Sequence, residues 1–320
     1  MNYSKQLRSI GLFNEIEGEF LQGKISGSYL FSCPDNLTSS LFMKELAKVL
    51  LQINTKDAEG LIAKIEAGTH PDVLVYPKGK IFMVEDAADI YDKVQVKPML
   101  ADYKVFIINN IDDATEQAQN KMLKIIEEPP ANVVFFMSQK HDGEVLQTIA
   151  SRSQKRVIGK IDNKLLYELL SKEEVEKQKL AIFLGEGYLG KTLEIIENDE
   201  FIQNYKNCLN ILKNLKKSEQ IVDFSGVISK NRDMFFTFLE NISKFIRDIL
   251  MIKLNKKDLV VNQNIMSDLN EISNEFSAGM LVEIINRLNL AKRKLDGNVN
   301  LVSLADNLLL EILEVKFLCK

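Results

Sequence analysis

The polar loop that follows the first apolar strand has the position of a phosphate-binding site. It runs from Ser32 to Ser40, after the short strand expected over Tyr29–Ser32 and before the apolar-periodic segment Leu41–Leu51. A phosphate-binding loop in this place uses glycines, which let backbone amides approach the phosphates, and a lysine that reaches the β and γ oxygens. This loop contains neither residue type. It has the position of a nucleotide site without the chemistry.

A second position for nucleotide chemistry lies at the end of the apolar run Val105–Ile108. An ATPase places acidic residues there, which hold magnesium and orient the attacking water. This chain has Asn109 and Asn110 instead. A neutral amide cannot act as a general base, so three catalytic elements are missing once the lysine is included. An active ATPase is not expected. The alternative, that neither loop was ever a nucleotide site, predicts the same inactivity.

The elements that must position these residues alternate between strands and helices. The runs Val105–Ile108 and Val133–Met137 are continuously apolar, which is typical of parallel strands covered on both faces. Between them, Asp113 stands three residues before Glu116, the spacing of a capping-box start, and the helical pattern ends before two consecutive prolines. Parallel strands are expected near residues 28–32, 72–76, 104–109, 132–137 and 155–158.

This pattern predicts a fold class of α/β plus all-α, because the apolar spacing becomes wholly helical after Gly159. We expect three domains: an α/β domain over residues 1–159 with a sheet of about five parallel strands, a small helical lid over 160–199 and a C-terminal helical domain over 200–320. The apolar stripe Phe235, Leu239, Ile242, Ile246 and Ile249 in the last domain is interpreted as core.

The segment NKMLKIIEEPP, followed by an apolar strand and then by SRS, resembles the NALLKTLEEPP and SRC hallmarks of the clamp-loader subunits of bacterial DNA polymerase III. These subunits belong to the AAA+ superfamily. The resemblance covers about the first two hundred residues in matching order and extends more loosely to the C-terminus. It implies an AAA+ type domain, a small lid and a C-terminal collar through which subunits assemble.

The resemblance also identifies the departures from nucleotide chemistry residue by residue. The positions of the family's phosphate loop are taken by Ser32, Cys33, Asn36, Thr38, Ser39 and Ser40. Glycines are usual at three of these positions, and Ser39 replaces the required lysine. In the lid, Gly190 stands where the ATPase members carry a nucleotide-sensing arginine. These losses resemble the delta-prime type of subunit rather than the ATPase subunits.

Arg152, in Ser151-Arg152-Ser153, is the residue to which the resemblance gives a catalytic role. In the clamp-loader family this arginine projects into the ATP site of a neighbouring subunit, where a guanidinium stabilises charge on the transferring phosphoryl group. Ser153 departs from the usual cysteine. Taken alone, an arginine between small polar residues is most simply a solvated turn residue.

Composition excludes several other classes of protein. A chain of 320 residues with a net charge of −4 does not predict direct DNA binding. Three distant cysteines, Cys33, Cys208 and Cys319, indicate a reducing cytoplasm, and no apolar run is long enough to span a bilayer. The segment Val49–Ala67, where many relatives insert a four-cysteine zinc module, has no cysteine. We expect no metal and no cofactor, and we interpret His70 as a hydrogen-bonded turn residue.

The sequence thus favours a non-hydrolysing clamp-loader subunit, a stator that assembles with gamma/tau-like ATPase subunits and the delta subunit. Through the complex it would reach the sliding clamp and primed DNA, and Arg152 would act on a neighbour's ATP. One alternative is an ATP-hydrolysing gamma/tau-like subunit, which Ser39, Asn109 and Asn110 argue against. Another is an AAA+-derived scaffold outside replication, which sequence alone leaves open.

The purified chain is expected not to hydrolyse ATP and to bind it weakly if at all, because the phosphate loop lacks both glycine and lysine. Steady-state phosphate release, measured across a size-exclusion peak of the chain, checks this expectation. Magnesium-dependent turnover that follows the chain through the column would contradict it.

Overall fold

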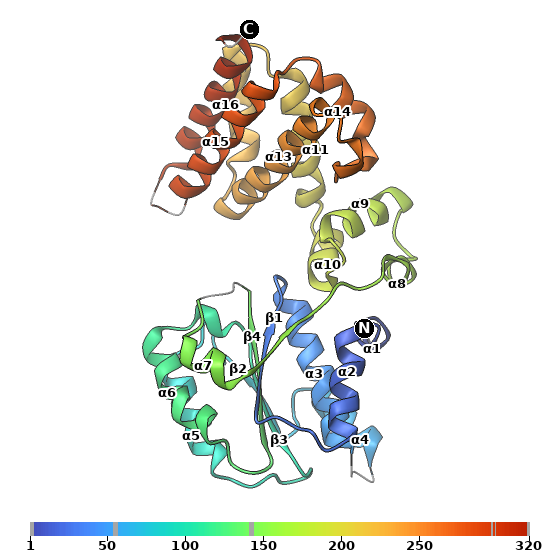
Figure 1. Cartoon of the computed structure of the whole chain (residues 1–320), viewed down its shortest axis with the longest axis vertical. Helices are drawn as coiled ribbons and strands as arrows, with labels where there is room; N and C mark the ends of the chain where they lie inside the picture. Colours follow the sequence, from blue (N-terminus) through green and yellow to red (C-terminus); the bar gives the residue numbers. More distant parts are fainter. Residues whose placement is uncertain (1–2, 54–56, 141–143, 296, 298, 319–320) are drawn as a thin grey trace. The chain divides into compact units, whose positions relative to one another are not determined.

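The computed structural model describes residues 3–53, 57–140, 144–295, 297 and 299–318. It divides into two compact units, Met1–Ile196 and Glu197–Lys320, each of which has its own core (Figure 1). The further separation of a lid from the first unit stays a prediction. Across the described residues, no helix combines the length and the apolar character needed to span a bilayer.

The first unit is built on a five-stranded sheet in which all strands are parallel. The strand order is β2-β3-β4-β1-β5, so the first strand lies between the fourth and the fifth. The strands are β1 Ser28–Ser32, β2 Val73–Tyr76, β3 Lys104–Ile108, β4 Val133–Gln139 and β5 Gln154–Val157. The predicted α/β fold and its five parallel strands are confirmed.

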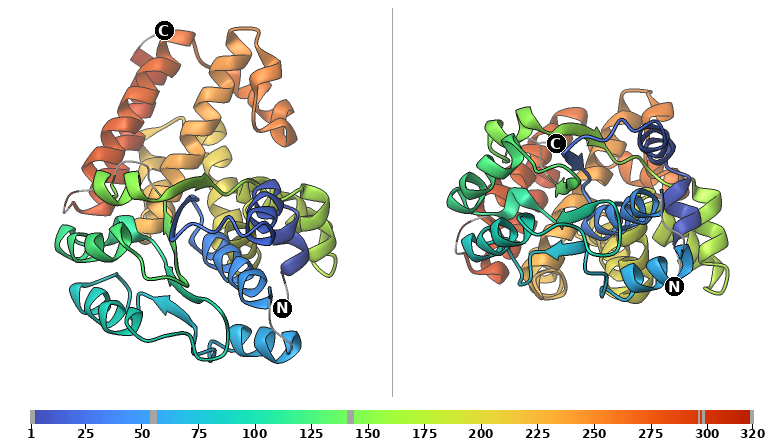
Figure 2. Two further views of the ribbon diagram at one scale, coloured as in Figure 1. Left: turned by 60° about the horizontal axis from the view of Figure 1, so that its bottom comes forward. Right: turned by 90° about the horizontal axis from the view of Figure 1, so that it is seen from below.

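Helices cover both faces of this sheet (Figure 1), and Figure 2 shows the same two layers from other directions. One layer holds α1 Ser4–Arg8, α2 Gly11–Leu21, α3 Asn36–Gln52 and α4 Ala58–Glu66, and the other holds α5 Val84–Val94, α6 Glu116–Glu127 and α7 Gln147–Arg152. Along β3, Val105 and Ile107 belong to the first core, whereas Phe106 and Ile108 belong to the second. Burial on both faces explains why the strand is continuously apolar.

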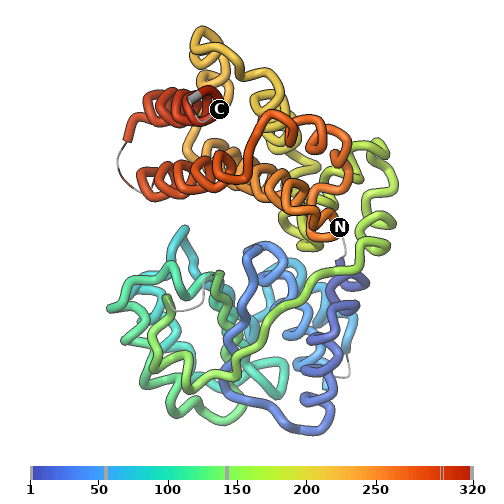
Figure 3. Tube along the Cα trace, turned by 45° about the horizontal axis from the view of Figure 1, so that its top comes forward, coloured from blue at the N-terminus to red at the C-terminus, as the bar shows by residue number. Residues whose placement is uncertain are grey.

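The remaining helices form the lid segment and the second unit. The helices of the segment predicted to be a lid, called the lid segment below, are α8 Asn163–Leu169, α9 Val175–Gly185 and α10 Leu189–Glu197. The second unit contains α11 Asp199–Asn214, α12 Ile221–Ile228, α13 Arg232–Lys253, α14 Met266–Ser273, α15 Ala278–Leu295 and α16 Leu301–Leu318. Helices α15 and α16 run side by side in Figure 3. The five residues of the predicted apolar stripe on α13 are fully buried, which confirms that they are core.

The expected start of α6 is wrong by two residues. Asp113 does not cap the helix, because Ile111–Asp113 form a short 3₁₀ turn that follows the left-handed residue Asn110. Thr115 is the N-cap instead, and its side chain accepts a hydrogen bond from the backbone N–H of Ala118 at 3.3 Å. The turn after β3 shifts the cap along the chain, which a spacing rule cannot detect.

His70 and Asp72 lie in the turn before β2 and organise the backbone there. Nδ1 of His70 accepts a hydrogen bond from the Asp72 N–H at 3.1 Å, so the expectation of a hydrogen-bonded turn histidine is confirmed. The Asp72 carboxylate is fully buried. It accepts the N–H groups of Met99, Leu100 and Ala101 at 2.7, 2.7 and 3.1 Å, which fixes the loop before β3.

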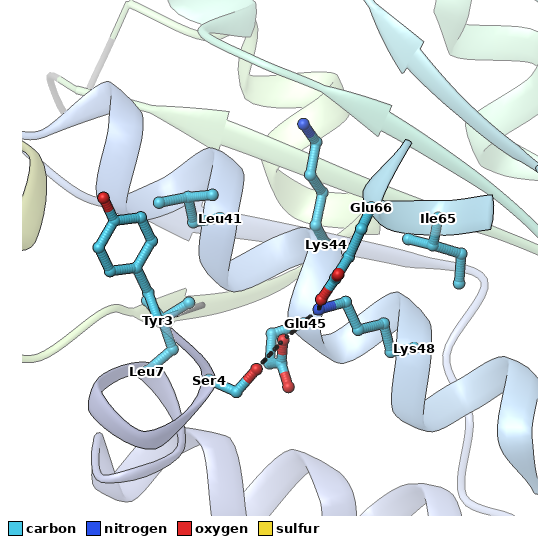
Figure 4. Close-up of a pocket in the computed structure, with 9 residues that line it drawn as sticks. All are labelled: Tyr3, Ser4, Leu7, Leu41, Lys44, Glu45, Lys48, Ile65 and Glu66. Atoms are coloured by element: carbon cyan, nitrogen blue, oxygen red, sulfur yellow. Dashed lines mark hydrogen bonds and ion pairs between the residues drawn. The ribbon is translucent and has the colours of Figure 1, made fainter. Parts of the chain in front are cut away.

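A partly buried ion-pair network joins α1, α3 and α4 beside a cavity of about 310 Å³ (Figure 4). Glu45 is only 3% exposed and accepts hydrogen bonds from Ser4, Arg8 and Lys48 at 3.1, 2.9 and 2.9 Å. The Lys48 ammonium also contacts Glu66 at 2.9 Å. Because the charged groups pair with one another, we interpret them as structural contacts between the helices rather than as a ligand site.

Glu45→Gln should weaken the first unit at pH 7 by about 2 kcal/mol, because it removes the carboxylate charge that pairs with the buried Lys48 ammonium. Burial alone would raise the pKa of Glu45, but hydrogen bonds from Lys48 and Arg8 hold it below its ordinary value of 4.5. A lowered pKa contributes stability that is present above that value and is lost as the pH falls below it. Hydrogen exchange of α3 amides in urea, between about pH 7 and pH 3, measures both effects.

The matched control is Glu15→Gln, which changes an exposed glutamate of α2. It should alter neither the stability at pH 7 nor the decline in acid. If the stability of Glu45→Gln fell as steeply with decreasing pH as that of the unmodified chain, the ion-pair network would not contribute to the pH dependence of stability.

Candidate functional site

The loop between β1 and α3 is shorter than the expected span of Ser32 to Ser40. Only Cys33, Pro34 and Asp35 lie between the two elements, because α3 begins at Asn36. The side chain of Asp35 caps the helix by accepting the N–H of Leu37 at 3.2 Å. The residues from Leu37 to Ser40 therefore belong to the helix, and the backbone does not form an open phosphate cradle there.

Three of the six residues at the predicted phosphate-loop positions are buried. Cys33, Thr38 and Ser39 are at most 1% exposed. Burial raises the pKa of the Cys33 thiol to about 11, which disfavours a reactive thiolate. The Ser39 hydroxyl donates to the carbonyl of Asn36 at 3.0 Å, and the Ser32 hydroxyl accepts from the Gln139 amide at 2.8 Å. These groups are engaged in internal structure.

Asp35 also connects this loop to the lid segment. Its carboxylate accepts the backbone N–H of Gly190 at 2.7 Å and that of Lys191 at 3.2 Å, at the first turn of α10. The Thr38 hydroxyl donates to the same carboxylate, and accepts the Gly190 N–H at 3.1 Å. One side chain therefore lies at the N-termini of two helices, α3 and α10, where a negative charge is favoured.

Gly190 leaves no room for a side chain. A Cβ atom there would overlap both carboxylate oxygens of Asp35 and the Cβ of Leu37. An arginine at this position would therefore require the contact between the loop and α10 to open. Gly190, which stands at the predicted position of the nucleotide-sensing arginine, thus lies where the loop after β1 approaches α10 closely.

Asn109 and Asn110 follow β3 at the same edge of the sheet as the loop after β1, because the strands are parallel. The Asn109 amide group donates to the Tyr76 carbonyl at 3.2 Å, and the Asn110 N–H donates to the Ser138 hydroxyl at 3.0 Å. Within the described residues, neither side-chain oxygen has a hydrogen-bond partner, and no three metal-ligating side chains gather in one place.

Arg152 lies at the opposite edge of the sheet. It is the last residue of α7, separated by one residue from β5, which begins at Gln154, and its carbonyl accepts a hydrogen bond from the hydroxyl of Ser28 at 2.9 Å. Ser28 begins β1 and Ser32 ends it, so roughly 13 Å of strand separates Arg152 from its own chain's loop. The sequence-based description of Arg152 as a turn residue is wrong, since it belongs to a helix. Its side chain is 41% exposed.

Sequence reasoning identified the loop, Asn109, Asn110 and Gly190 but missed Asp35 as the residue that connects the loop and the lid. Its signal was weak, because aspartate is a favoured N-cap residue but stands six positions before the apolar-periodic segment that begins at Leu41. Its second role had no local signal, since Gly190 is 155 positions away.

Two family models match the chain in succession. The model described as "DNA polymerase III, delta subunit" matches residues 10–162, and the one described as "DNA polymerase III, delta subunit, C terminal" matches residues 199–313. The first covers the sheet domain and the second covers most of the C-terminal unit.

Curated relatives carry names from the same complex. The chain is 22% identical to DNA polymerase III subunit delta' of Bacillus subtilis, over 78% of this chain and 78% of the relative. It is 27% identical to subunit delta' of Haemophilus influenzae, over 75% and 78%. It is 28% identical to subunit tau of Bacillus subtilis over 68% of this chain, which spans only 37% of tau. With both family models in order and delta' relatives matched over most of their length, the chain belongs to the clamp-loader subunits of DNA polymerase III and is delta-prime-like among them.

Proposed function

We propose that this chain is a non-hydrolysing subunit of the clamp loader, a stator with a fixed lid. The observation that carries the proposal is the contact between Asp35 and the Gly190 N–H at 2.7 Å, in the place where a nucleotide would lie between loop and lid. A protein carboxylate fills the anion position at the start of α10. A bound triphosphate would have to displace a charge that belongs to the chain.

The tau relative makes an ATP-hydrolysing subunit the main rival. Such a subunit needs a lysine to contact the phosphates and carboxylates to hold magnesium. Ser39 is buried and bonded to its own helix, while Asn109 and Asn110 offer only neutral amides. These residues favour a non-hydrolysing subunit over an ATP-hydrolysing one.

We further propose that Arg152 acts on the ATP of a neighbouring subunit. Its guanidinium is half-exposed at the sheet edge opposite its own chain's loop. A planar, positively charged guanidinium can stabilise the negative charge that develops on a transferring phosphoryl group. Because Arg152 cannot reach its own loop across the length of β1, another molecule must supply the phosphate.

The partners that follow from this proposal are gamma/tau-like ATPase subunits and the delta subunit, with the sliding clamp and primed DNA reached through the complex. A scaffold outside replication is the remaining alternative. Co-purification of the tagged chain with a tau-type subunit from the same cells separates the two, since a scaffold outside replication would not retain that subunit.

Arg152→Ala should leave the chain folded and incorporated, because a half-exposed ion pair contributes only about 0–1 kcal/mol. The DNA-stimulated ATPase of the neighbouring subunit should nevertheless fall steeply, since arginine fingers are worth roughly 10³ in rate or more. Arg152→Lys should rescue poorly, because an ammonium cannot reproduce the forked donors. Steady-state ATPase and clamp loading by reconstituted complexes measure the effect.

Arg156→Ala is the matched control. Arg156 is 31% exposed in β5 and pairs with Glu19 at 3.0 Å, so its loss also removes a charge and an ion pair. Complexes that contain it should retain the unmodified rate. An equal loss in both variants would point to general damage, and an unmodified rate in Arg152→Ala would leave only the stator role.

Asp35→Ala should loosen the lid. Without the carboxylate, the Lys191 N–H loses its acceptor, the Gly190 N–H keeps only the Thr38 hydroxyl, and α3 loses a cap worth about 1 kcal/mol. We expect amide exchange at these two residues to rise by about tenfold or more. Asp162→Ala is the control, because Asp162 caps α8 through Lys164 and lies at the start of a different lid helix. Equal exchange at Gly190 in all three chains would contradict the fixed lid.

A further inference from the structure

Glu127 ends α6, and its carboxylate contacts the guanidinium of Arg152. The Arg152 NH2 group lies 2.9 Å from Oε1 of Glu127, and the two side chains are 41% and 42% exposed. The NH1 group donates to the carbonyl of Thr148, one turn earlier on α7, at 3.1 Å. One guanidinium N–H group is thus hydrogen-bonded and a second nitrogen lies in an ion pair, which leaves the outer part of the guanidinium for another molecule.

The backbones that carry these two side chains are fixed to the start of β1. The Ser28 hydroxyl donates to the Arg152 carbonyl at 2.9 Å, and the Ser153 hydroxyl donates to the Ile149 carbonyl at 2.9 Å. On the other side, Pro129 packs against Gly27 so closely that a Cβ atom on the glycine would overlap the proline ring. The motifs EEPP and SRS therefore meet at one place in the fold, joined through Gly27 and Ser28.

We propose that Glu127 is a positioning residue for Arg152, a role that rests on the proposed function of Arg152 in trans. A free arginine side chain samples many rotamers, and ordering it at the moment of contact with a phosphate lowers the rate. Glu127 and the Thr148 carbonyl hold the Arg152 guanidinium in one orientation before it meets the phosphate. Because a half-exposed ion pair is weak, the phosphate of a neighbour can still compete for the guanidinium.

Glu128 supplies a matched control from the next position in the chain. It is exposed, and the ion pair of Arg152 is formed with Glu127 rather than with Glu128. Glu128→Ala therefore removes the same charge from the same turn without touching Arg152. Glu127→Gln is the conservative variant, since its amide oxygen can still accept a hydrogen bond from the guanidinium.

The first measurement uses the free chain, without any partner. The heteronuclear NOE of the Arg152 Nε–H, assigned by its absence in Arg152→Ala, reports how ordered the guanidinium is. Glu127→Ala should lower this NOE towards that of a mobile side chain, Glu127→Gln should restore part of it, and Glu128→Ala should leave it unchanged. An unmodified NOE in Glu127→Ala would overturn the proposal.

The second measurement uses complexes reconstituted with gamma/tau-like ATPase subunits. Glu127→Ala should lower the DNA-stimulated kcat by about three- to tenfold and leave KM for ATP unchanged. The substitution makes the Arg152 side chain less ordered but does not remove its guanidinium charge. If Arg152→Ala abolishes stimulation while Glu127→Ala retains the unmodified kcat, the positioning role fails and the proposed function stands. If Arg152→Ala also retains the unmodified kcat, the proposed function fails, and the positioning role in catalysis fails with it.

Discussion

The carboxylate of Asp35 is the constraint on which the geometry of the site depends. It caps α3 through Leu37 and accepts the first amides of α10 through Gly190 and Lys191. The N-terminal ends of the two helices, which carry partial positive charge, thus share one internal anion. The same contact explains why residue 190 has no side chain, since a Cβ atom would overlap the carboxylate.

The parallel sheet places the loop after β1 and Arg152 at opposite edges of the first unit. The carboxyl edge carries the loop after β1 together with Asn109 and Asn110, and it holds amides and buried hydroxyls in place of nucleotide chemistry. The amino edge carries Arg152, whose guanidinium keeps a permanent charge. The proposed loss of nucleotide chemistry at one edge and the proposed role of Arg152 at the other are compatible, because the length of β1 separates the two.

The strands and the long helices could be predicted because their signals are local. Continuous apolar runs predicted β3 and β4, and the stripe beginning at Phe235 predicted the core of α13. Local rules failed where a turn intervened. Asn110 adopts a left-handed conformation that leads into a 3₁₀ turn, so the cap of α6 moved from Asp113 to Thr115. Similarly, the expected loop from Ser32 to Ser40 became helical from Asn36, because Asp35 caps that helix.

The sequence by itself determined which chemistry is missing, because the absence of a lysine at Ser39 and of carboxylates at Asn109 and Asn110 holds in any fold. Only the tertiary structure decided what replaces it. The Asp35 contact with Gly190 joins residues 155 positions apart, and the Glu127 contact with Arg152 joins the ends of two helices. Such pairs depend on strand order and on the length of each connection, whereas periodicity in a sequence reports only which side of an element is buried.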